Sequence, residues 1–325
     1  MSTFRGANYN NNNNNNNNGN LNGGSSNFQR LGNQGNTKKS PLDKIQAVLN
    51  DENFRKNYLQ KFENFTDRIE SYSDLPIFEL LKPYTPLIAR LLIVATFYED
   101  SIRIVSQWKD QVFYLWNYRH IPYFLVLLFL SLISVTMIIS SSMLILRKKI
   151  VYATSALIIT VVLQAFVYGL VSGFTFVLRN ISVIGGLLIA LGDSIVTSKG
   201  TFGLLPELHN KTSDMKNFIL LTGRILIVVM FVTFSITKNW ITVILTIFGT
   251  LLISIGYKTK FASILLLLIL FFYNITINNY WFYKKGKRDF LKYEFYQNLS
   301  IMGGLLLTVN TGAGKHSLDE KKKIY

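Results

Sequence analysis

The chain has 325 residues, a formal net charge of +16 and no cysteine. The absence of cysteine excludes disulfides, thiolate chemistry, iron–sulfur clusters and cysteine-ligated zinc. A strongly basic chain can bind nucleic acid or an anionic membrane surface. Here the lysines and arginines lie mainly in the polar N-terminal region, in breaks between apolar runs and in the tail. That placement favours membrane lipids over nucleic acid, which we do not expect as a partner.

Residues 1–40 are of low complexity, with an unbroken asparagine run from Asn10 to Asn18. Such a segment cannot bury enough apolar surface to offset the entropy lost on ordering, so the sequence predicts a disordered Asn-rich tail. No positively charged start followed by an apolar stretch opens the chain. We therefore expect no cleaved signal peptide and a cytosolic N-terminus.

The next region, residues 41–82, has a different character. Apolar residues recur there at spacings of three to five between positions 42 and 71, with Lys, Glu and Asp between them. This pattern predicts an amphipathic helix that lies on the membrane or on the bundle, in a cytosolic helical region. Pro83 and Pro86 then mark the entry to a transmembrane domain that we expect to cover residues 83–312.

Eight hydrophobic segments follow Pro86, each close to the length that crosses a bilayer. They cover about 87–106, 121–146, 150–171, 177–196, 220–237, 239–256, 260–281 and 295–311. The first, fifth and eighth are short or interrupted by polar residues, so six or seven spans are alternatives. The pattern predicts an all-α fold, a polytopic membrane helical bundle of about eight spans.

Short internal matches predict that these spans form two parallel four-helix repeats, at about 87–197 and 220–312. The matching stretches are Ala89–Val94 with Gly223–Val228, Arg147–Lys149 with Lys258–Lys260, and Asn180–Leu188 with Asn298–Leu306. An even number of spans in each repeat brings both repeats into the membrane from the same side and both termini to one face. We expect the glycine pairs in the last match to let helix backbones approach closely.

The tail, residues 313–325, ends Asp319-Glu320-Lys321-Lys322-Lys323-Ile324-Tyr325. Lys322 and Lys323 are the fourth and third residues from the carboxyl end, which is the pattern of the dilysine retrieval signal of endoplasmic reticulum membrane proteins. A vesicle coat reads the two ammonium groups with the terminal carboxylate, so the signal acts only in the cytosol. Basic residues between the spans give a mixed result by the positive-inside rule. The tail therefore decides the predicted orientation, with both termini cytosolic.

Four blocks of the sequence, spread over roughly residues 80–325, form a recognisable pattern. The blocks are Ala89–Leu91 with Thr96–Arg103 and Gln107–Trp108; Leu178–Asn180 with Gly185–Leu188; Ile255–Lys260; and Asp289–Gln297 with Gly303–Leu307 and Asp319–Lys323. Together they resemble the surfeit locus protein 4 family of endoplasmic reticulum cargo receptors. The resemblance implies a receptor that exports soluble secretory proteins from the endoplasmic reticulum to the Golgi in coated vesicles. It would bind lumenal cargo through short signals near the mature N-termini.

The resemblance also implies partners and a location. The COPII coat would carry the receptor forward, and the COPI coat would retrieve it through the dilysine tail. The protein would then be a multi-pass membrane protein of the endoplasmic reticulum that cycles through the intermediate compartment and the Golgi.

Charged residues within the predicted spans are candidates for function, because each costs about 2.5–3.5 kcal/mol near the bilayer centre. Glu99, Asp100 and Arg103 lie in the first span, and helical spacing lets Arg103 pair with either carboxylate. Arg179 opens the fourth span on the predicted lumenal side. Two interpretations stay open: an ion pair that stabilises helix contacts, or a lumen-facing polar pocket for cargo formed by these residues.

The sequence shows no nucleophile–base pair, phosphate-binding glycine loop or metal-ligand spacing, so we expect no enzyme, no cofactor and no metal site. The alternative function is a membrane transporter of a small solute in the endoplasmic reticulum. Sequence repeats and charged residues within spans suit that function as well.

Overall fold

The computed structural model describes residues 52–72, 82–198, 206–236, 240–312, 314 and 317–319. The predicted Asn-rich tail and the two lysines of the predicted retrieval signal lie outside these residues. The chain divides into two units, Met1–Asn57 and Tyr58–Tyr325. Of the first unit, only the helical residues 52–57 are described.

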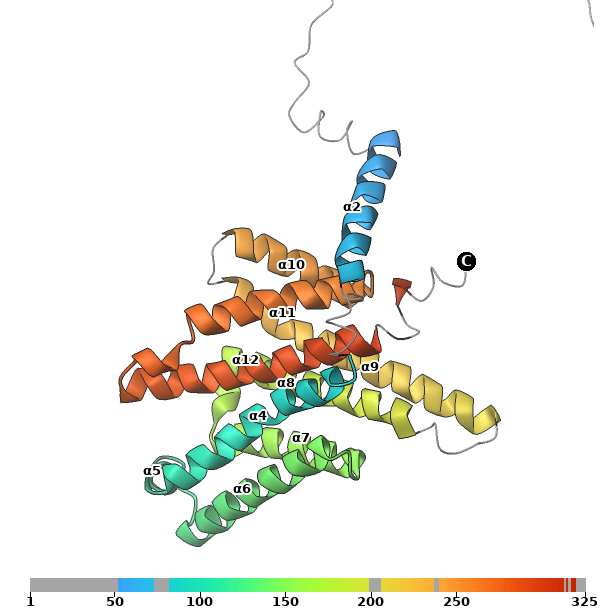
Figure 1. Cartoon of the computed structure of the whole chain (residues 1–325). Helices are drawn as coiled ribbons and strands as arrows, with labels where there is room; N and C mark the ends of the chain where they lie inside the picture. Colours follow the sequence, from blue (N-terminus) through green and yellow to red (C-terminus); the bar gives the residue numbers. More distant parts are fainter. Residues whose placement is uncertain are drawn as a thin grey trace, which may run out of the picture. The chain divides into compact units, whose positions relative to one another are not determined.

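Helices form nearly all of the described part of the chain, and no strand occurs in it (Figure 1). The α-helices are α2 (Glu52–Tyr72), α4 (Thr85–Ser106), α5 (Trp108–Phe113), α6 (Tyr123–Ile145), α7 (Ile150–Val167), α8 (Phe174–Ser198), α9 (Pro206–Ile236), α10 (Trp240–Ile255), α11 (Thr259–Thr276) and α12 (Lys285–Thr311). Between them lie a π-helix, η1 (Tyr114–Tyr118), and two 3₁₀ turns, η2 (Leu170–Ser172) and η4 (Tyr280–Phe282). The prediction of an all-α fold is confirmed.

A helix lies at each of the eight predicted hydrophobic segments, namely α4 and α6 to α12. Within the described residues, four helices are long and apolar enough to cross a membrane: Tyr123–Ile145, Ile150–Val167, Phe174–Ile195 and Thr259–Phe282. The helix α10 is apolar but shorter. The fold is therefore a helical membrane protein with several spans, and the count of eight stays a prediction.

Local sequence explains where these helices begin and end. Pro86 stands in the first turn of α4, and Pro122 precedes α6, because proline suits the start of a helix, where its missing N–H costs nothing. Gly169, just past α7, has a positive φ of 69° that glycine adopts without steric cost. Gly312 ends α12 in the same way, with φ at 71°.

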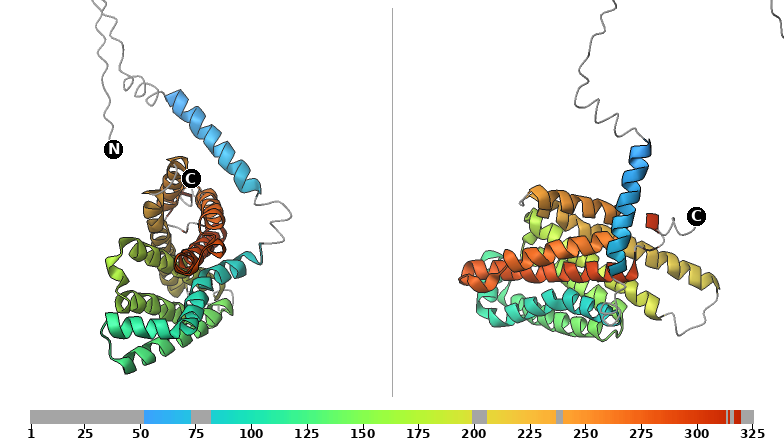
Figure 2. Two further views of the ribbon diagram at one scale, coloured as in Figure 1. Left: turned by 90° about the vertical axis from the view of Figure 1, so that its left-hand side faces the viewer. Right: turned by 45° about the horizontal axis from the view of Figure 1, so that its top comes forward.

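Two seams of close packing organise the bundle, α8 against α9 and α12 against α4 (Figures 1 and 2). A Cβ atom added at Gly185 in α8 would lie 2.8 Å from the backbone oxygen of Gly223 in α9. One added at Gly303 in α12 would lie 2.5 Å from the backbone oxygen of Ala89 in α4. The close backbone approach that the glycine pairs predicted is present at both seams.

The helices α8 and α12 also join each other through two hydrogen bonds between side chains. Arg179 Nη1 of α8 donates to Asn298 Oδ1 of α12 over 3.3 Å. Gln297 Nε2 of α12 donates to Asn180 Oδ1 of α8 over 3.0 Å. Each helix thus gives one asparagine, and the residue before that asparagine reaches across to the other helix.

The turns that precede α7 and α11 have the same backbone form. Arg147 and Lys149 have positive φ angles of 56° and 46°, and Gly256 and Lys258 have 76° and 47°. Lys149 and Lys258 are the residues immediately before α7 and α11. The backbone therefore matches Lys149 with Lys258, a register two residues away from the predicted match of Arg147–Lys149 with Lys258–Lys260.

The amphipathic stretch predicted over residues 42–71 is helical as α2 from Glu52 to Tyr72, and residues 42–51 lie outside the described part. Its apolar side packs on the bundle. The ring of Phe62 meets Phe248 of α10 and Phe261 of α11 edge to face, with centroids 5.8 and 6.2 Å apart. Asp67 of α2 forms an ion pair with Lys258.

Candidate binding cavity beside α4

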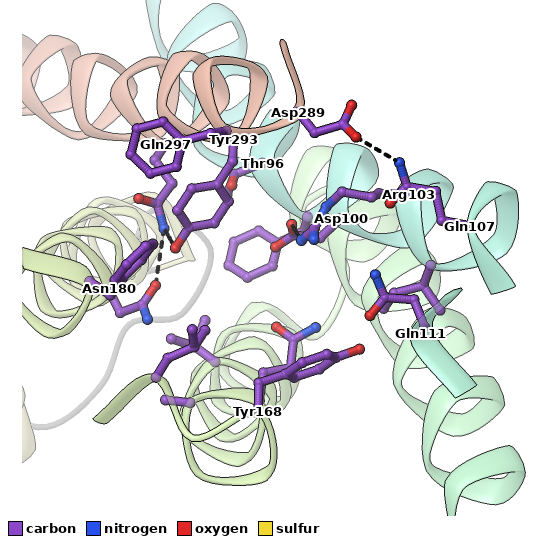
Figure 3. A pocket seen from close by; sticks show the side chains of 18 of the residues that line it. Thr96, Asp100, Arg103, Gln107, Gln111, Tyr168, Asn180, Asp289, Tyr293 and Gln297 are labelled. Atoms are coloured by element: carbon purple, nitrogen blue, oxygen red, sulfur yellow. Dashed lines mark hydrogen bonds and ion pairs between the residues drawn. The ribbon is translucent and has the colours of Figure 1, made fainter. Parts of the chain in front are cut away.

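A cavity of about 450 Å³ lies between α4, α7, α8 and α12 (Figure 3). It lies toward the end of the bundle where α4 runs into α5, since residues of α5, the first residue of η1 and the first residue of η2 also line it. At this end the chain turns back between spans, so the cavity adjoins connecting segments and not only helix interiors.

Two helix faces supply most of the polar wall. Thr96, Asp100, Arg103 and Gln107 follow one another along α4 and its C-cap at spacings of three and four, which places their side chains on one side of the helix. Asp289, Tyr293 and Gln297 do the same on α12 at spacings of four. Figure 3 shows the two sets side by side, with Gln107 bonded to Asp289, and Tyr168 on the far side of the cavity.

Hydrogen bonds fix the charged groups on this wall. Arg103 Nη2 donates to Asp100 Oδ1 over 2.5 Å, and Gln107 Nε2 donates to Asp289 Oδ2 over 3.2 Å. Among the described residues that line the cavity, the carboxylates are Asp100, Asp110 and Asp289, and the one cationic side chain is Arg103. The lining therefore has more acidic than basic side chains.

Amides and aromatic rings complete the lining. The amide side chains are Gln107, Gln111, Gln164, Asn180 and Gln297, and the rings are Phe97, Tyr114, Tyr168, Phe176, Phe290 and Tyr293. Amides both donate and accept hydrogen bonds, so they suit the alternating groups of a peptide backbone. The rings offer apolar contact area. This combination can hold an extended ligand with polar and apolar parts.

A stacked pair of tyrosines holds the wall formed by η1 and the end of α7. Tyr114 and Tyr168 lie with ring centroids 6.1 Å apart and planes 13° apart, and the Tyr114 hydroxyl donates to the Tyr168 carbonyl over 3.2 Å. Arg119 Nε donates to the carbonyl of Val167, one of the carbonyls left free at the end of α7. The π-helical η1 is thereby fixed beside the cavity.

The structure brings together two of the four predicted cargo-site residues, Asp100 and Arg103. Glu99 does not line the cavity; it lines a separate hollow on another side of α4, although its Oε2 lies 3.8 Å from Arg103 Nε. Arg179 does not line the cavity either. Its guanidinium pairs with Glu294 over 2.8 Å inside the bundle.

Sequence reasoning missed most of the polar lining, above all Gln107, Asn180, Asp289, Tyr293 and Gln297. A signal for the residues of α12 was present, because residues spaced by four lie on one side of a helix. Asp289 and Tyr293 were missed because the predicted eighth segment began at residue 295, whereas α12 begins at Lys285.

No group of His, Asp and Glu side chains that could hold a metal ion occurs among the described residues. The lining offers a ligand one ion pair, amides and aromatic rings.

Comparisons with known proteins agree with the resemblance. Residues 63–325 match the SURF4 family. The chain is 61% identical to the ER-derived vesicles protein ERV29 of Saccharomyces cerevisiae over 83% of this chain and 87% of that protein. It is 36% identical to a surfeit locus protein 4 homolog of Schizosaccharomyces pombe over 89% of this chain and 100% of that protein.

A surfeit locus protein 4 homolog of Drosophila melanogaster is 37% identical, over 74% of this chain and 91% of its own length. No solved structure gives a significant match. Because the family match extends over most of the sequence, including every residue that lines the cavity, the chain belongs to the SURF4 family.

Proposed function

We propose that this protein is a receptor that exports soluble secretory proteins from the endoplasmic reticulum to the Golgi, and that the cavity beside α4 binds the cargo. The single observation that carries the proposal is the cavity itself, which combines an ion pair, amides and aromatic rings next to the segments that connect the spans. A peptide segment of a soluble protein can reach such a place without entering the lipid.

The family relationship supports the setting. A relative with 61% identity is named an ER-derived vesicles protein, and the chain has several helices that can cross a membrane. We accordingly propose a multi-pass protein of the endoplasmic reticulum membrane that leaves in COPII vesicles. Lys322 and Lys323 would return it from the Golgi by binding the COPI coat.

The proposed topology has eight spans in two parallel repeats, with both termini in the cytosol. The paired seams of α8 with α9 and α12 with α4, and the two hydrogen bonds between α8 and α12, support the repeats. The same topology puts the connection from α4 to α6 in the lumen, which makes the cavity accessible to lumenal cargo.

Within the cavity, Asp100 and Arg103 are the residues that we propose to contact cargo. Glu99 would act through Arg103, whose guanidinium it attracts from the other side. Arg179 would take part less directly, by holding α8 to α12 through Glu294 and Asn298.

The proposal is tested by the amount of cargo bound per molecule of full-length receptor, measured by crosslinking and pull-down. We expect Asp100→Asn and Arg103→Gln each to lower this ratio by roughly tenfold, the effect of losing one charge-assisted hydrogen bond. Lys287→Met is the matched control, because Lys287 is an exposed residue of α12 that does not line the cavity. It should leave the ratio unchanged.

A ratio equal to wild type in both cavity variants would contradict the cargo site. If the ion pair only stabilises helix contacts, thermal stability and abundance fall while the ratio is kept. A transporter of small solutes would show neither a change in this ratio nor a loss of secreted proteins when the gene is deleted.

A further inference from the structure

A second hollow, of about 280 Å³, lies between α4 and α12 alone. It is lined by Leu91, Val94, Ala95, Tyr98, Glu99, Ile102, Lys292 and Tyr296. None of these residues lines the cargo cavity, which lies on another side of α4. Leu91 and Ile102 at its rim are 45% and 61% exposed, so the hollow borders an apolar surface that lipid would cover in a membrane.

Glu99 is the unusual residue of this hollow. It is 4% exposed, yet neither of its carboxylate oxygens accepts a hydrogen bond of good geometry from a described side chain. Lys292 Nζ lies 3.4 Å from Oε1, and Arg103 Nε lies 3.8 Å from Oε2. These two cations attract the carboxylate, but at these distances they leave its oxygens able to accept further hydrogen bonds. Burying a carboxylate is costly unless hydrogen bonds satisfy the lone pairs of its oxygens. The Glu99 oxygens can therefore accept hydrogen bonds from the donor groups of a ligand.

The hollow has a polar part and, from there back toward the start of α4, an apolar part; Ile102 adds an apolar side chain on the other side of Glu99. Glu99, Lys292 and Tyr296 form the polar part, where Lys292 Nζ also lies 6.0 Å from the centre of the Tyr296 ring. Ala95 and Leu91 lie four and eight residues before Glu99 on α4, which is about 6 and 12 Å along the helix axis. A ligand that fills the hollow therefore needs a charged head and an apolar tail.

We propose that this hollow binds a phospholipid whose headgroup carries both a phosphate and a primary ammonium group, as in phosphatidylethanolamine. The ammonium N–H groups would donate to the Glu99 oxygens, and Lys292 would donate to the phosphate. A choline headgroup lacks N–H groups, so it cannot supply the missing donors. The acyl chain would follow Leu91, Val94 and Ala95. A peptide ammonium is the competing ligand, and the exposed apolar rim favours the lipid.

The experiment uses the full-length protein in nanodiscs with equal amounts of phosphatidylethanolamine and phosphatidylcholine, and native mass spectrometry counts the lipids that stay bound. Wild type should retain phosphatidylethanolamine in roughly tenfold preference, the effect of one charge-assisted hydrogen bond. Glu99→Gln should abolish the preference, because a neutral amide replaces the carboxylate. Lys292→Met should lower retention of both lipids, since both contain the phosphate. Lys287→Met on the same helix is the control and should behave as wild type.

Ala95→Leu tests the apolar part without touching a charge. The larger side chain narrows the hollow, so retention of both lipids should fall while the protein remains folded.

Equal retention of the two lipids by wild type, or an undiminished preference in Glu99→Gln, would overturn the proposal. So would a cargo peptide that displaces phosphatidylethanolamine from the wild-type hollow, which would assign the hollow to cargo. These results are separate from the cargo ratio of Asp100→Asn, so either proposal can fail alone.

Discussion

At the scale of residues, ion pairs connect the charged side chains of α4 that line the cavity with the one that lines the second hollow. Arg103 pairs with Asp100 at the cavity and lies near Glu99, which in turn lies near Lys292 of α12. The sequence left two interpretations open, an ion pair that stabilises helices or a pocket. The geometry shows that they are compatible, because the ion pair of Asp100 and Arg103 is itself part of the cavity wall.

The glycine at the seam of α12 and α4 gives a test of residue packing. A Cβ atom at Gly303 would lie 2.5 Å from the Ala89 oxygen and 2.8 Å from the Ile93 nitrogen, and backbone atoms cannot move aside cheaply. Gly303→Ala should therefore lower the free energy of unfolding by about 1–3 kcal/mol, seen as a lower apparent Tm in detergent.

The control is Gly286→Ala in the same helix, where an added Cβ meets nothing within 4 Å. This change should be neutral or stabilise by up to about 1 kcal/mol, because alanine is the better helix former. Equal Tm values for the two variants would show that the seam is not closely packed.

At the scale of elements, the sequence predicted the existence of the helices better than their ends. A helix lies at each of the eight predicted segments, including the first, fifth and eighth, whose hydropathy signal is short or interrupted by polar residues. Hydropathy placed the starts of α9 and α12 at residues 220 and 295, whereas the helices begin at Pro206 and Lys285. Charged residues end a hydropathy signal but continue a helix, since Lys, Arg and Glu have good helix propensity. Three cavity residues of α12, Asp289, Phe290 and Tyr293, fell in this gap.

The start of α11 depends on a contact that no local pattern announces. Asp319, far along the chain, caps this helix: Oδ1 accepts from the Lys258 backbone N–H over 2.6 Å, and Oδ2 accepts from the Thr259 N–H over 2.9 Å. Asp319→Ala should cost about 0.5–2 kcal/mol of stability, the usual effect of losing a helix cap.

Amide hydrogen exchange measures this loss directly. Exchange at Lys258 and Thr259 should become faster in Asp319→Ala, while the exposed neighbour Leu318 can be replaced by alanine as a control without effect. Unchanged exchange at both amides would mean that the cap contributes nothing.

At the scale of the molecule, the two proposed repeats differ in how they fill one location. When α8 and α12 are aligned on their glycine pairs, Glu294 of α12 corresponds to Phe176 of α8. When α7 and α11 are aligned on Lys149 and Lys258, Asn274 of α11 corresponds to Ala165 of α7. Phe176 and Ala165 line the open cavity. Glu294 instead pairs with Arg179, and Asn274 accepts from the Asn298 amide over 3.1 Å. The second repeat thus fills with a polar network the place that the first leaves open.

The proposed topology makes a prediction for the whole molecule, because glycans are added to Asn-X-Ser/Thr sites only on the lumenal side. Asn210-Lys211-Thr212 connects the two proposed repeats and lies in the cytosol under the eight-span topology, so Asn210 should carry no glycan. A flexible insertion with an Asn-Ser-Thr site after the exposed residue Asn117 should be glycosylated, since η1 would face the lumen. Glycosylation at each of the two sites is measured by the shift in gel mobility of the protein after endoglycosidase treatment. A glycan on Asn210, or none at the inserted site with the protein correctly inserted, would contradict eight spans with both termini cytosolic.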